Sequence, residues 1–140
     1  MTEATSIESA RAFLRANHRA TMATTRADGR TQMSPVTTDV DEDGYVVVST
    51  RETARKVAHL RREPYAAFAV VTDGFYGPWV QVEGPVQIVP LPDAMDGLVN
   101  YYRRVSGEHP DWDDYRAAMI RDQRCLLKLT IERVGPTIQG

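Results

Sequence analysis

Metal-binding and nucleophilic groups are scarce in this sequence. Cys125 is the only cysteine among 140 residues, so the chain can form neither an internal disulfide nor a thiolate cluster for a metal. The three histidines, His18, His59 and His109, lie far apart and lack the spacing of metal ligands. Cys125 has only Arg124 as an activating neighbour, which favours a packed, inert thiol. The sequence therefore predicts no metal site and no cysteine nucleophile, and it fits a reducing compartment.

Long apolar runs and the common nucleotide-binding motifs are missing too. No apolar stretch approaches the roughly 20 residues that span a bilayer, and residues 1–4 lack the basic start of a signal peptide. The chain has neither a glycine-rich dinucleotide fingerprint nor a phosphate loop ending in Gly-Lys-Ser or Gly-Lys-Thr. The formal net charge of −2 argues against a nucleic-acid binder, because backbone phosphates require an excess of cations. We therefore expect a cytoplasmic protein without membrane or nucleic-acid partners.

The composition that remains is that of an ordinary globular protein. Hydrophobic residues make up 42% and charged residues 26% of the chain, which places it outside the disordered and membrane classes. A length of 140 residues is enough for one hydrophobic core but not for two. We expect a single domain over residues 1–140.

Six strand patterns, joined by turn signals, run through the chain. Asp28-Gly29 closes a first hairpin and residues 41–44 close a second, so three consecutive antiparallel strands are expected. Near the end, Leu127, Leu129 and Ile131 alternate with polar residues, as in a half-buried strand. The predicted strands span residues 20–25, 31–40, 45–50, 65–71, 79–89 and 125–132.

Four helices are predicted around these strands. Thr5 and Glu8 form a capping box for the first, and residues 53–62 form the second. Pro92 begins the third, and Asp111 caps the fourth. The apolar stripes of the last two helices are Met95, Leu98, Val99 and Tyr102, and Trp112, Tyr115, Met119 and Ile120. Six antiparallel strands with four helices indicate an α+β fold whose sheet curls into a small barrel.

A positive segment follows the third predicted strand. Residues 51–62 hold five basic residues and one acidic residue, on a chain that is acidic overall. Hydroxyls such as those of Ser49-Thr50, backbone N–H groups and basic side chains at a strand-to-helix junction are typical of a phosphate site. The alternative is a solvated helix face, and the residues alone leave both open. The basic face carries Arg55, Lys56, His59 and Arg62, and the apolar face carries Ala54, Val57, Ala58 and Leu60.

Two further segments are candidates for lining a site. Residues 32–36 contain Pro35, which cannot donate to a sheet ladder, so this strand should lie at an edge. A flat ligand can lie along such a strand, although a plain edge strand is the simpler interpretation. Residues 72–78 form a loop rich in turn formers and aromatic side chains, as loops that line sites often are.

Taken together, several segments resemble one known family. They are residues 23–25, 28–36, 49–50, 55–64, 82–84, 101–103, 107–115 and the closing strand. Their order and spacing are similar to those of the pyridoxamine-5'-phosphate-oxidase-like split β-barrel proteins, and more narrowly of the F-420-dependent (deazaflavin) oxidoreductase branch of actinobacterial type. The ending, residues 132–140, lacks the Arg-Leu-x-Pro of true pyridoxamine phosphate oxidases, which argues against vitamin B6 oxidation.

This resemblance implies a split-barrel homodimer whose cofactor sites are built from both chains. It implies that Lys56, Arg55 and the Ser49-Thr50 strand end hold the phosphate of coenzyme F-420, while residues 32–36 back the deazaflavin ring. Residues 76–81 of the partner subunit would close the pocket. The implied cofactor-binding residues are Gln32, Met33, Ser34, Pro35, Val36, Val48, Ser49, Thr50, Arg55, Lys56, Tyr76, Trp79 and Gln81.

The resemblance also implies an activity, namely hydride transfer between reduced F-420 and an electron-poor small organic substrate. Tyr76 is then a candidate proton donor. The cofactor carries the difficult chemistry, so the protein supplies orientation, an anion clamp and a dry wall, and needs no recognisable acid–base pair. Two alternatives stand beside this hypothesis. One is an FMN-dependent oxidoreductase of the same family, and the other is a non-catalytic F-420 carrier.

Overall fold

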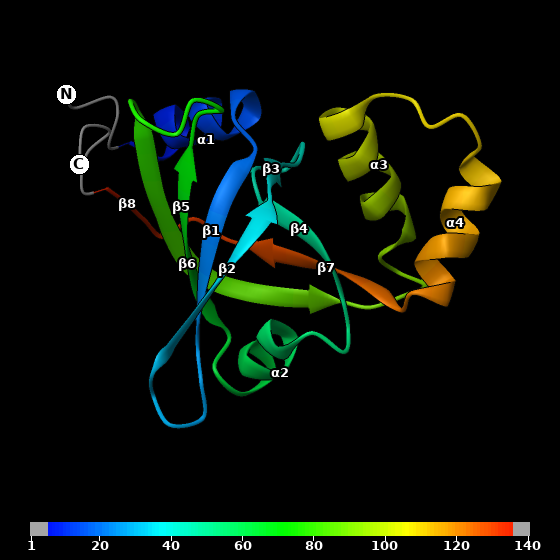
Figure 1. Ribbon diagram of the computed structural model, residues 1–140, viewed down its shortest axis with the longest axis horizontal. Coiled ribbons are helices and arrows are strands. Elements are labelled where there is room, and N and C mark those ends of the chain that lie inside the picture. Colours follow the sequence, from blue (N-terminus) through cyan, green and yellow to red (C-terminus); the bar gives the residue numbers. More distant parts are fainter. Residues whose placement is uncertain (1–5, 136–140) are drawn as a thin grey trace.

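Eight antiparallel strands form one strongly curled sheet in the computed structural model, which describes residues 6–135 (Figure 1). The strand order is β2-β1-β5-β6-β7-β4-β3, and β8 pairs with β6. The predicted α+β class is confirmed, and two short strands, β3 and β8, raise the predicted number of six. The strand bounds are β1 Arg19–Thr25, β2 Thr31–Thr37, β3 Asp39–Val40, β4 Val46–Arg51, β5 Tyr65–Val71, β6 Trp79–Val89, β7 Arg124–Leu129 and β8 Arg133–Gly135.

Four helices flank this sheet within the described residues. In Figure 1, α3 and α4 lie together on one side of the barrel, while α2 covers its lower end. None of the four has the length and apolar character of a membrane-spanning segment. Their bounds are α1 Ile7–Ala16, α2 Arg55–Arg62, α3 Met95–Ser106 and α4 Trp112–Arg121.

The helix starts agree only in part with the predictions. Asp111 caps α4 as predicted, because its side chain accepts a hydrogen bond from the Asp114 N–H. The N-cap of α1 is Ser6, whose Oγ accepts from the N–H of Ser9 at 3.0 Å. Thr5, the predicted cap, lies outside the described residues, as do residues 136–140. The prediction that α3 begins at Pro92 is wrong, because residues 91–94 form a separate turn before the helix.

A crossover at Thr38 replaces the long strand that was predicted over residues 31–40. Thr38 is fully buried, its N–H donates to the His18 carbonyl at 2.8 Å, and its Oγ1 donates to the Val47 carbonyl at 3.1 Å. Before this residue β2 pairs with β1, and after it β3 pairs with β4, at the opposite end of the strand order. The predicted run of three consecutive antiparallel strands is therefore wrong. The curl of the sheet brings β2 and β4 close together, although the two strands do not pair.

The long strand β6 belongs to both halves of the sheet. Its first part pairs with β5, up to Pro85 opposite Tyr65, and from Val86 onward it pairs with β7. The chain leaving β7 crosses over Gly84 at this switch, where a Cβ atom would lie 1.8 Å from the Thr130 carbonyl oxygen. Only glycine fits so close an approach of two backbones.

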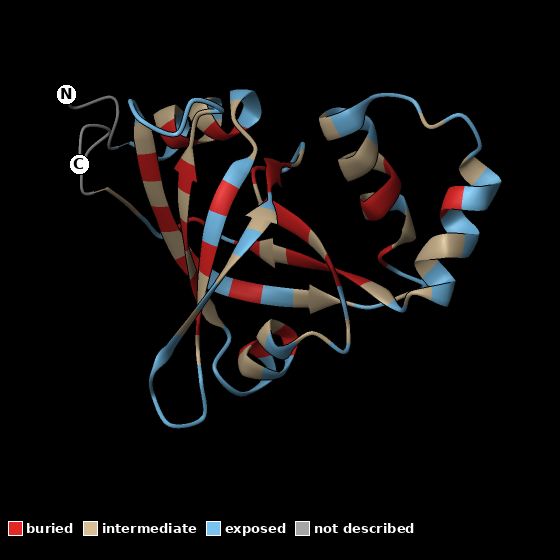
Figure 2. Cartoon of the chain, in the orientation of Figure 1, coloured by how far each residue is buried: buried red, intermediate tan, exposed pale blue. Residues whose placement is uncertain are grey.

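The side chains divide into two hydrophobic clusters. One fills the barrel and includes Phe68, which is 1% exposed, while the other packs α3 and α4 on the outer side of β4 and β7. Figure 2 shows buried and less buried residues alternating along the strands, as the period of two requires. Val57 and Leu60 anchor α2 as predicted, but Ala58 is exposed, and so is Ile120 at 63%. Ile120 belongs to α4, so α2 and α4 both bury a narrower apolar stripe than their sequences indicated.

Gly84 provides a test of the crossing strands. We expect Gly84→Ala to lower the free energy of unfolding by about 3 kcal/mol, because the added methyl group meets backbone atoms that cannot move aside. Urea denaturation followed by circular dichroism measures this change. The matched control is Gly74→Ala, where a Cβ meets nothing within 4 Å, and it should change stability by less than about 1 kcal/mol. Equal stability of the two variants would contradict the crossing.

Candidate functional site

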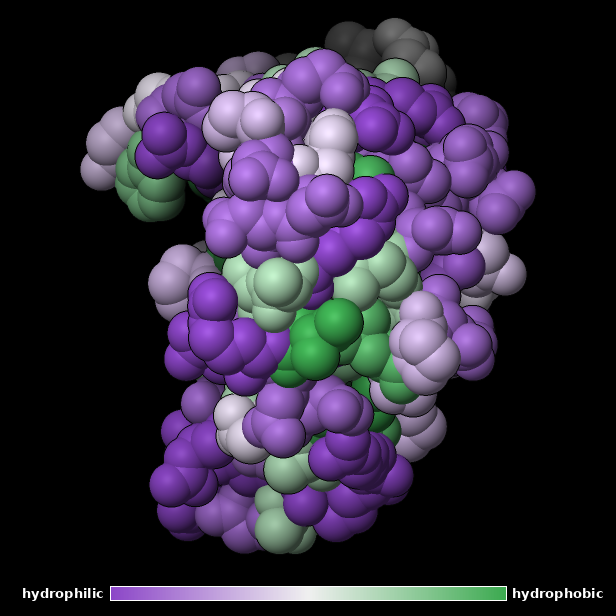
Figure 3. Space-filling view, turned by 90° about the vertical axis from the view of Figure 1, so that its right-hand side faces the viewer, coloured by the Kyte–Doolittle hydropathy of each residue, from purple (hydrophilic) through white to green (hydrophobic). Residues whose placement is uncertain are grey.

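A cavity of about 560 Å³ lies between the barrel wall and the α3–α4 pair. The end of β2 and the adjoining part of β4, which the curl of the sheet brings close together, form its barrel side. Figure 3 views the face that carries α3 and α4, where apolar side chains gather within a largely hydrophilic surface. The residues that line the cavity are Pro35, Val36, Thr37, Val48, Ser49, Thr50, Lys56, Tyr101, Tyr102, Tyr115, Met119 and Arg124.

Lys56 and Arg124 are the charged groups of this cavity, and among the described residues no carboxylate lines it. The pKa of Lys56 lies below its ordinary value, first because burial disfavours the ammonium ion and second because Arg124 repels it. The Nε atom of Arg124 is buried and finds no hydrogen-bond partner in residues 6–135. Two neighbouring cations and an unsatisfied buried donor form a site whose electrostatics an anion would improve.

Strand pairing brings these groups together from distant parts of the sequence. β4 and β7 run antiparallel, so that Thr50 lies opposite Cys125 and Arg51 lies opposite Arg124. A tight turn then starts α2, because the Ala54 N–H donates to the Arg51 carbonyl at 3.0 Å. As a result, Ser49 and Thr50 of β4, Lys56 of α2 and Arg124 of β7 line one cavity. This is a donor set that suits a phosphate.

Three tyrosines form the opposite wall. Tyr101 donates its hydroxyl to the Thr37 carbonyl at 2.7 Å, and Tyr115 donates to the Leu98 carbonyl at 2.9 Å. Burial raises the pKa of both, that of Tyr101 to about 12, so both stay neutral. The Tyr102 ring packs edge-on against Tyr115 with centroids 5.0 Å apart, and its hydroxyl has no hydrogen bond to the described residues. Tyr102 is therefore the tyrosine whose hydroxyl is available to a ligand.

The structure brings together about half of the residues that the sequence singled out for a site. These residues make one whole side of the cavity, which runs from β2, the strand that contains Pro35, to the basic helix α2. They are Pro35, Val36, Val48, Ser49, Thr50 and Lys56. Sequence reasoning missed Arg124 and the tyrosine wall. The only available signals were the Arg124-Cys125 pair and the tyrosines in the predicted helix stripes.

The remaining predicted residues lie elsewhere in the same chain. Gln32 and Arg55 line a separate hollow beside His59, and Met33 and Gln81 lie in an apolar hollow formed by β1, β2, β5 and β6. Ser34 lies on β2 between Gln32 and Val36, on the same side of the strand as both. Tyr76, which is 87% exposed, and Trp79 belong to the loop before β6 and the start of β6. A single chain thus does not unite the whole predicted set.

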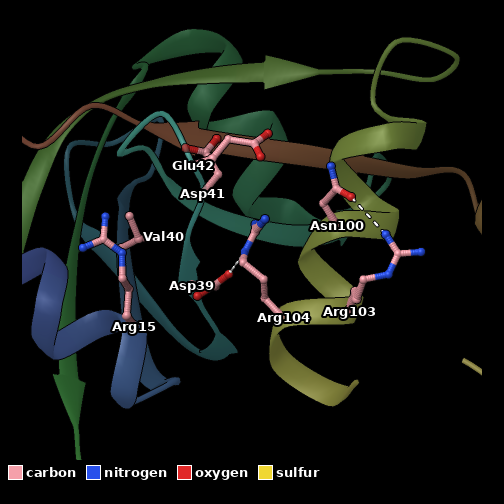
Figure 4. Close-up of a pocket in the computed structure, with 8 residues that line it drawn as sticks. All are labelled: Arg15, Asp39, Val40, Asp41, Glu42, Asn100, Arg103 and Arg104. Carbon is pink, nitrogen blue, oxygen red and sulfur yellow. Dashed lines mark hydrogen bonds and ion pairs between the residues drawn. The ribbon is translucent and has the colours of Figure 1, made fainter. Parts of the chain in front are cut away.

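A further hollow, of about 480 Å³, lies between α1, the β3–β4 turn and α3 (Figure 4). Three basic and three acidic residues line it, so their formal charges balance. Arg104 forms an ion pair with the buried Asp39, and Arg103 forms one with Glu108 at 2.6 Å. The Asp41 carboxylate accepts from the Tyr45 N–H within its own turn. The Asp39 ion pair ties α3 to the crossover, and the balanced charges of the lining offer a charged ligand no net attraction.

The comparisons with known proteins agree with this architecture. The family model described as pyridoxamine 5'-phosphate oxidase matches residues 6–137, which is nearly the whole chain. The chain belongs to this family. Membership in the pyridoxamine 5'-phosphate oxidase family confirms the broader part of the resemblance found in the sequence and accounts for the curled antiparallel sheet. It does not decide between branches of the family.

Solved structures show the same fold at low sequence identity. The conserved hypothetical protein Rv2991 from Mycobacterium tuberculosis superposes with a TM-score of 0.76 at 22% identity, over 92% of this chain and 82% of that one. An F-420 reductase gives 0.70 at 18% identity, over 89% and 94%. The heme storage protein HutZ from Vibrio cholerae gives 0.70 at 14% identity, over 91% and 92%. These similarities confirm the split-barrel fold that the resemblance implied.

Cys125 follows Arg124 on β7, and the reactivity of its thiol tests how tightly this part of the barrel is packed. The residue is 0% exposed, and burial, followed by the charge of Glu52, raises the pKa of its thiol to about 11. At pH 8 the thiol is therefore protonated, and we expect the folded protein not to react with Ellman's reagent. The protein unfolded in guanidinium should release one equivalent of chromophore, and a Cys125→Ala variant should release none. Stoichiometric reaction of the folded protein would contradict this burial.

Proposed function

We propose that this protein binds coenzyme F-420 in the Lys56–Arg124 cavity and works as a deazaflavin-dependent oxidoreductase. The observation that carries the proposal is the pair of cations without a carboxylate, together with the unpartnered Nε of Arg124. The resemblance in the sequence and the fold shared with an F-420 reductase support the choice of cofactor. A volume of about 560 Å³ lies within the usual range of cofactor sites.

The lining residues fit such a cofactor from its phosphate to its ring. Lys56 and Arg124, with Ser49 and Thr50 at the strand end, would hold the phosphate through charge-assisted hydrogen bonds. Apolar strand residues and the tyrosine wall would hold a flat ring by stacking and would exclude water from it. When bound, F-420 supplies the hydride chemistry itself. The chain's own contribution is binding, orientation and a dry environment.

Solvent can deliver the substrate's proton, and a tyrosine can do so only if its hydroxyl faces the ligand. The hydroxyls of Tyr101 and Tyr115 are engaged with backbone carbonyls, and burial raises the pKa of each. Tyr102 has no such bond among the described residues, so it is the better candidate within the chain. Tyr76 does not line this cavity, and its predicted role as proton donor therefore requires a second copy of the chain.

We also propose that the protein is a homodimer that pairs through the outer face of β1, β2, β5 and β6. This face carries small side chains around the exposed Met33, which is 69% exposed, and it includes Gln81. A second copy seated here would bring its loop 72–78 and Gln81 toward the first copy, as the family resemblance implies. The small residues of the face are Thr21, Ala23, Ala67 and Ala69.

The dimer proposal leads to a charge-insertion test. Ala69→Glu should convert the dimer to a monomer in sedimentation velocity, because a symmetric interface would bury the new carboxylate twice at a cost of several kcal/mol. Ala117→Glu places the same change on an exposed residue of α4 and should leave the dimer intact. A wild-type protein that sediments as a monomer, or an Ala69→Glu variant that remains dimeric, would overturn the proposed interface.

Cofactor binding is tested by fluorescence titration of the protein with F-420. Lys56→Gln and Arg124→Gln should each weaken binding by roughly 1.5–3 kcal/mol, about 10- to 100-fold, because each removes a charge-assisted contact to the phosphate. Arg116→Gln removes an exposed positive charge from α4 and serves as the control. Circular dichroism checks that the variants are folded.

The same titration decides among the alternatives. FMN offers the same phosphate and a similar ring, and hemin is included because a protein of this fold is described as a heme storage protein. Preference for FMN or hemin over F-420 would refute the cofactor assignment. If F-420 binds, oxidation of the reduced cofactor by a panel of enones and quinones separates an enzyme from a carrier. Binding without turnover on any acceptor would favour the carrier.

A further inference from the structure

The hollow between α1, the β3–β4 turn and α3 (the α1–α3 hollow) contains two opposite charges that lack partners (Figure 4). Arg15 lines it from the last turn of α1, and its guanidinium group makes no hydrogen bond or ion pair with any described residue. Glu42 lines it from the turn, and its carboxylate has no partner within residues 6–135. The remaining charged side chains of the lining are engaged in ion pairs or, for Asp41, in hydrogen bonds of the turn.

Asn100 adds a neutral polar group on the α3 side of this hollow. In Figure 4 it lies across the hollow from Arg15. Its Oδ1 accepts one long hydrogen bond, from Arg103 at 3.5 Å, which leaves the two N–H donors of its amide for a ligand. The volume of about 480 Å³ is within the usual range of small-molecule sites. Balanced charges do not attract a simple ion, but a molecule with charges of both signs can pair with Arg15 and Glu42 at once.

A smaller hollow of about 150 Å³ adjoins the α1–α3 hollow. The two share four lining residues, among them Glu42 and Asn100. The apolar part of the smaller hollow is formed by Val47 of β4, Gly97 of α3 and Leu126 of β7. A ligand in the larger hollow can therefore extend an apolar stem into the smaller one.

The charges of the smaller hollow favour a cation at the end of such a stem. Four acidic and two basic residues line it, so its formal charge is negative. Lys128, one of the two bases, lies 3.8 Å from the Asp41 carboxylate and 4.4 Å from the centre of the Tyr45 ring. The carboxylates of Asp43 and Asp96 have no partner in the part of the chain that the structure describes. A cation near them relieves their mutual repulsion.

We propose that the two hollows together bind a free α-amino acid with a basic side chain. Arg15 pairs with the α-carboxylate, Asn100 donates a further hydrogen bond, and Glu42 accepts from the α-ammonium group. The methylene stem lies along the apolar part of the smaller hollow, and the side-chain cation lies near its unpaired carboxylates. Each charge of the ligand thus meets an unpaired charge of opposite sign. The site shares no residue with the Lys56–Arg124 cavity, so it does not depend on which cofactor that cavity binds.

The site is tested by NMR titration of the isotope-labelled full chain with L-arginine at low salt, because salt screens exposed charges. The side-chain amide of Asn100, identified by the loss of its signal in Asn100→Asp, should shift as L-arginine is added. Agmatine, which lacks the carboxylate, and L-citrulline, whose side chain is neutral, should each bind about tenfold more weakly. If the amide signal does not move, or if either analogue binds as tightly as L-arginine, the proposal is wrong.

Matched variants assign each contact. Arg15→Gln should weaken L-arginine binding about tenfold and leave agmatine binding unchanged, because agmatine has no carboxylate for Arg15 to hold. Asp96→Asn should weaken binding of L-arginine but not of L-citrulline, and Glu42→Gln should weaken binding of all three. Glu63→Gln removes an exposed carboxylate after α2 and is the control that should change no affinity. A loss in Glu63→Gln equal to that in Glu42→Gln, or equal losses of L-arginine and agmatine binding in Arg15→Gln, would overturn the site.

Discussion

The passage of the chain through Thr38 is the constraint on which the rest of the structure depends. A buried threonine bonded to His18 and Val47 ends β2 and starts β3 at the opposite end of the strand order. The sheet must curl for one residue to link its two ends, and the curl places the end of β2 beside β4. The same crossover holds α3, through the Tyr101 bond to Thr37 and the ion pair of Arg104 with the buried Asp39. Both walls of the cavity are thus fixed by one short segment.

The Lys56–Arg124 cavity contains electrostatic interactions that destabilise the protein without a ligand. Lys56 and Arg124 repel each other without a neutralising carboxylate, and the buried Nε of Arg124 lacks a partner among the described residues. In a marginally stable domain such groups lower stability unless a ligand compensates them. Elsewhere in the described chain buried charge is paired, as Asp39 is with Arg104. The contrast between these two regions is a stronger indication of a binding site than the number of basic residues.

The sequence predicted local features well and long-range ones poorly. The strands Tyr65–Val71 and Trp79–Val89 were found because their patterns depend on neighbouring residues, and Asp111 was found because a cap is a local hydrogen bond. The break at Thr38 was missed because its hydrogen bonds reach residues far along the chain, while Thr-Thr-Asp-Val reads locally as a continuous strand. Arg124 was missed for the same reason, since only its register opposite Arg51 brings it to the cavity.

The division of the basic helix between two hollows follows from how little of it is needed for packing. Only Val57 and Leu60 of the eight residues of α2 are buried, and a helix this short is stable only because the barrel holds them. The other positions are free to carry charge around the axis. Lys56 and Arg55, separated by about 100°, therefore diverge toward the Lys56–Arg124 cavity and the hollow beside His59. A charge count groups these residues together, whereas the rotation of the helix places them in two different hollows.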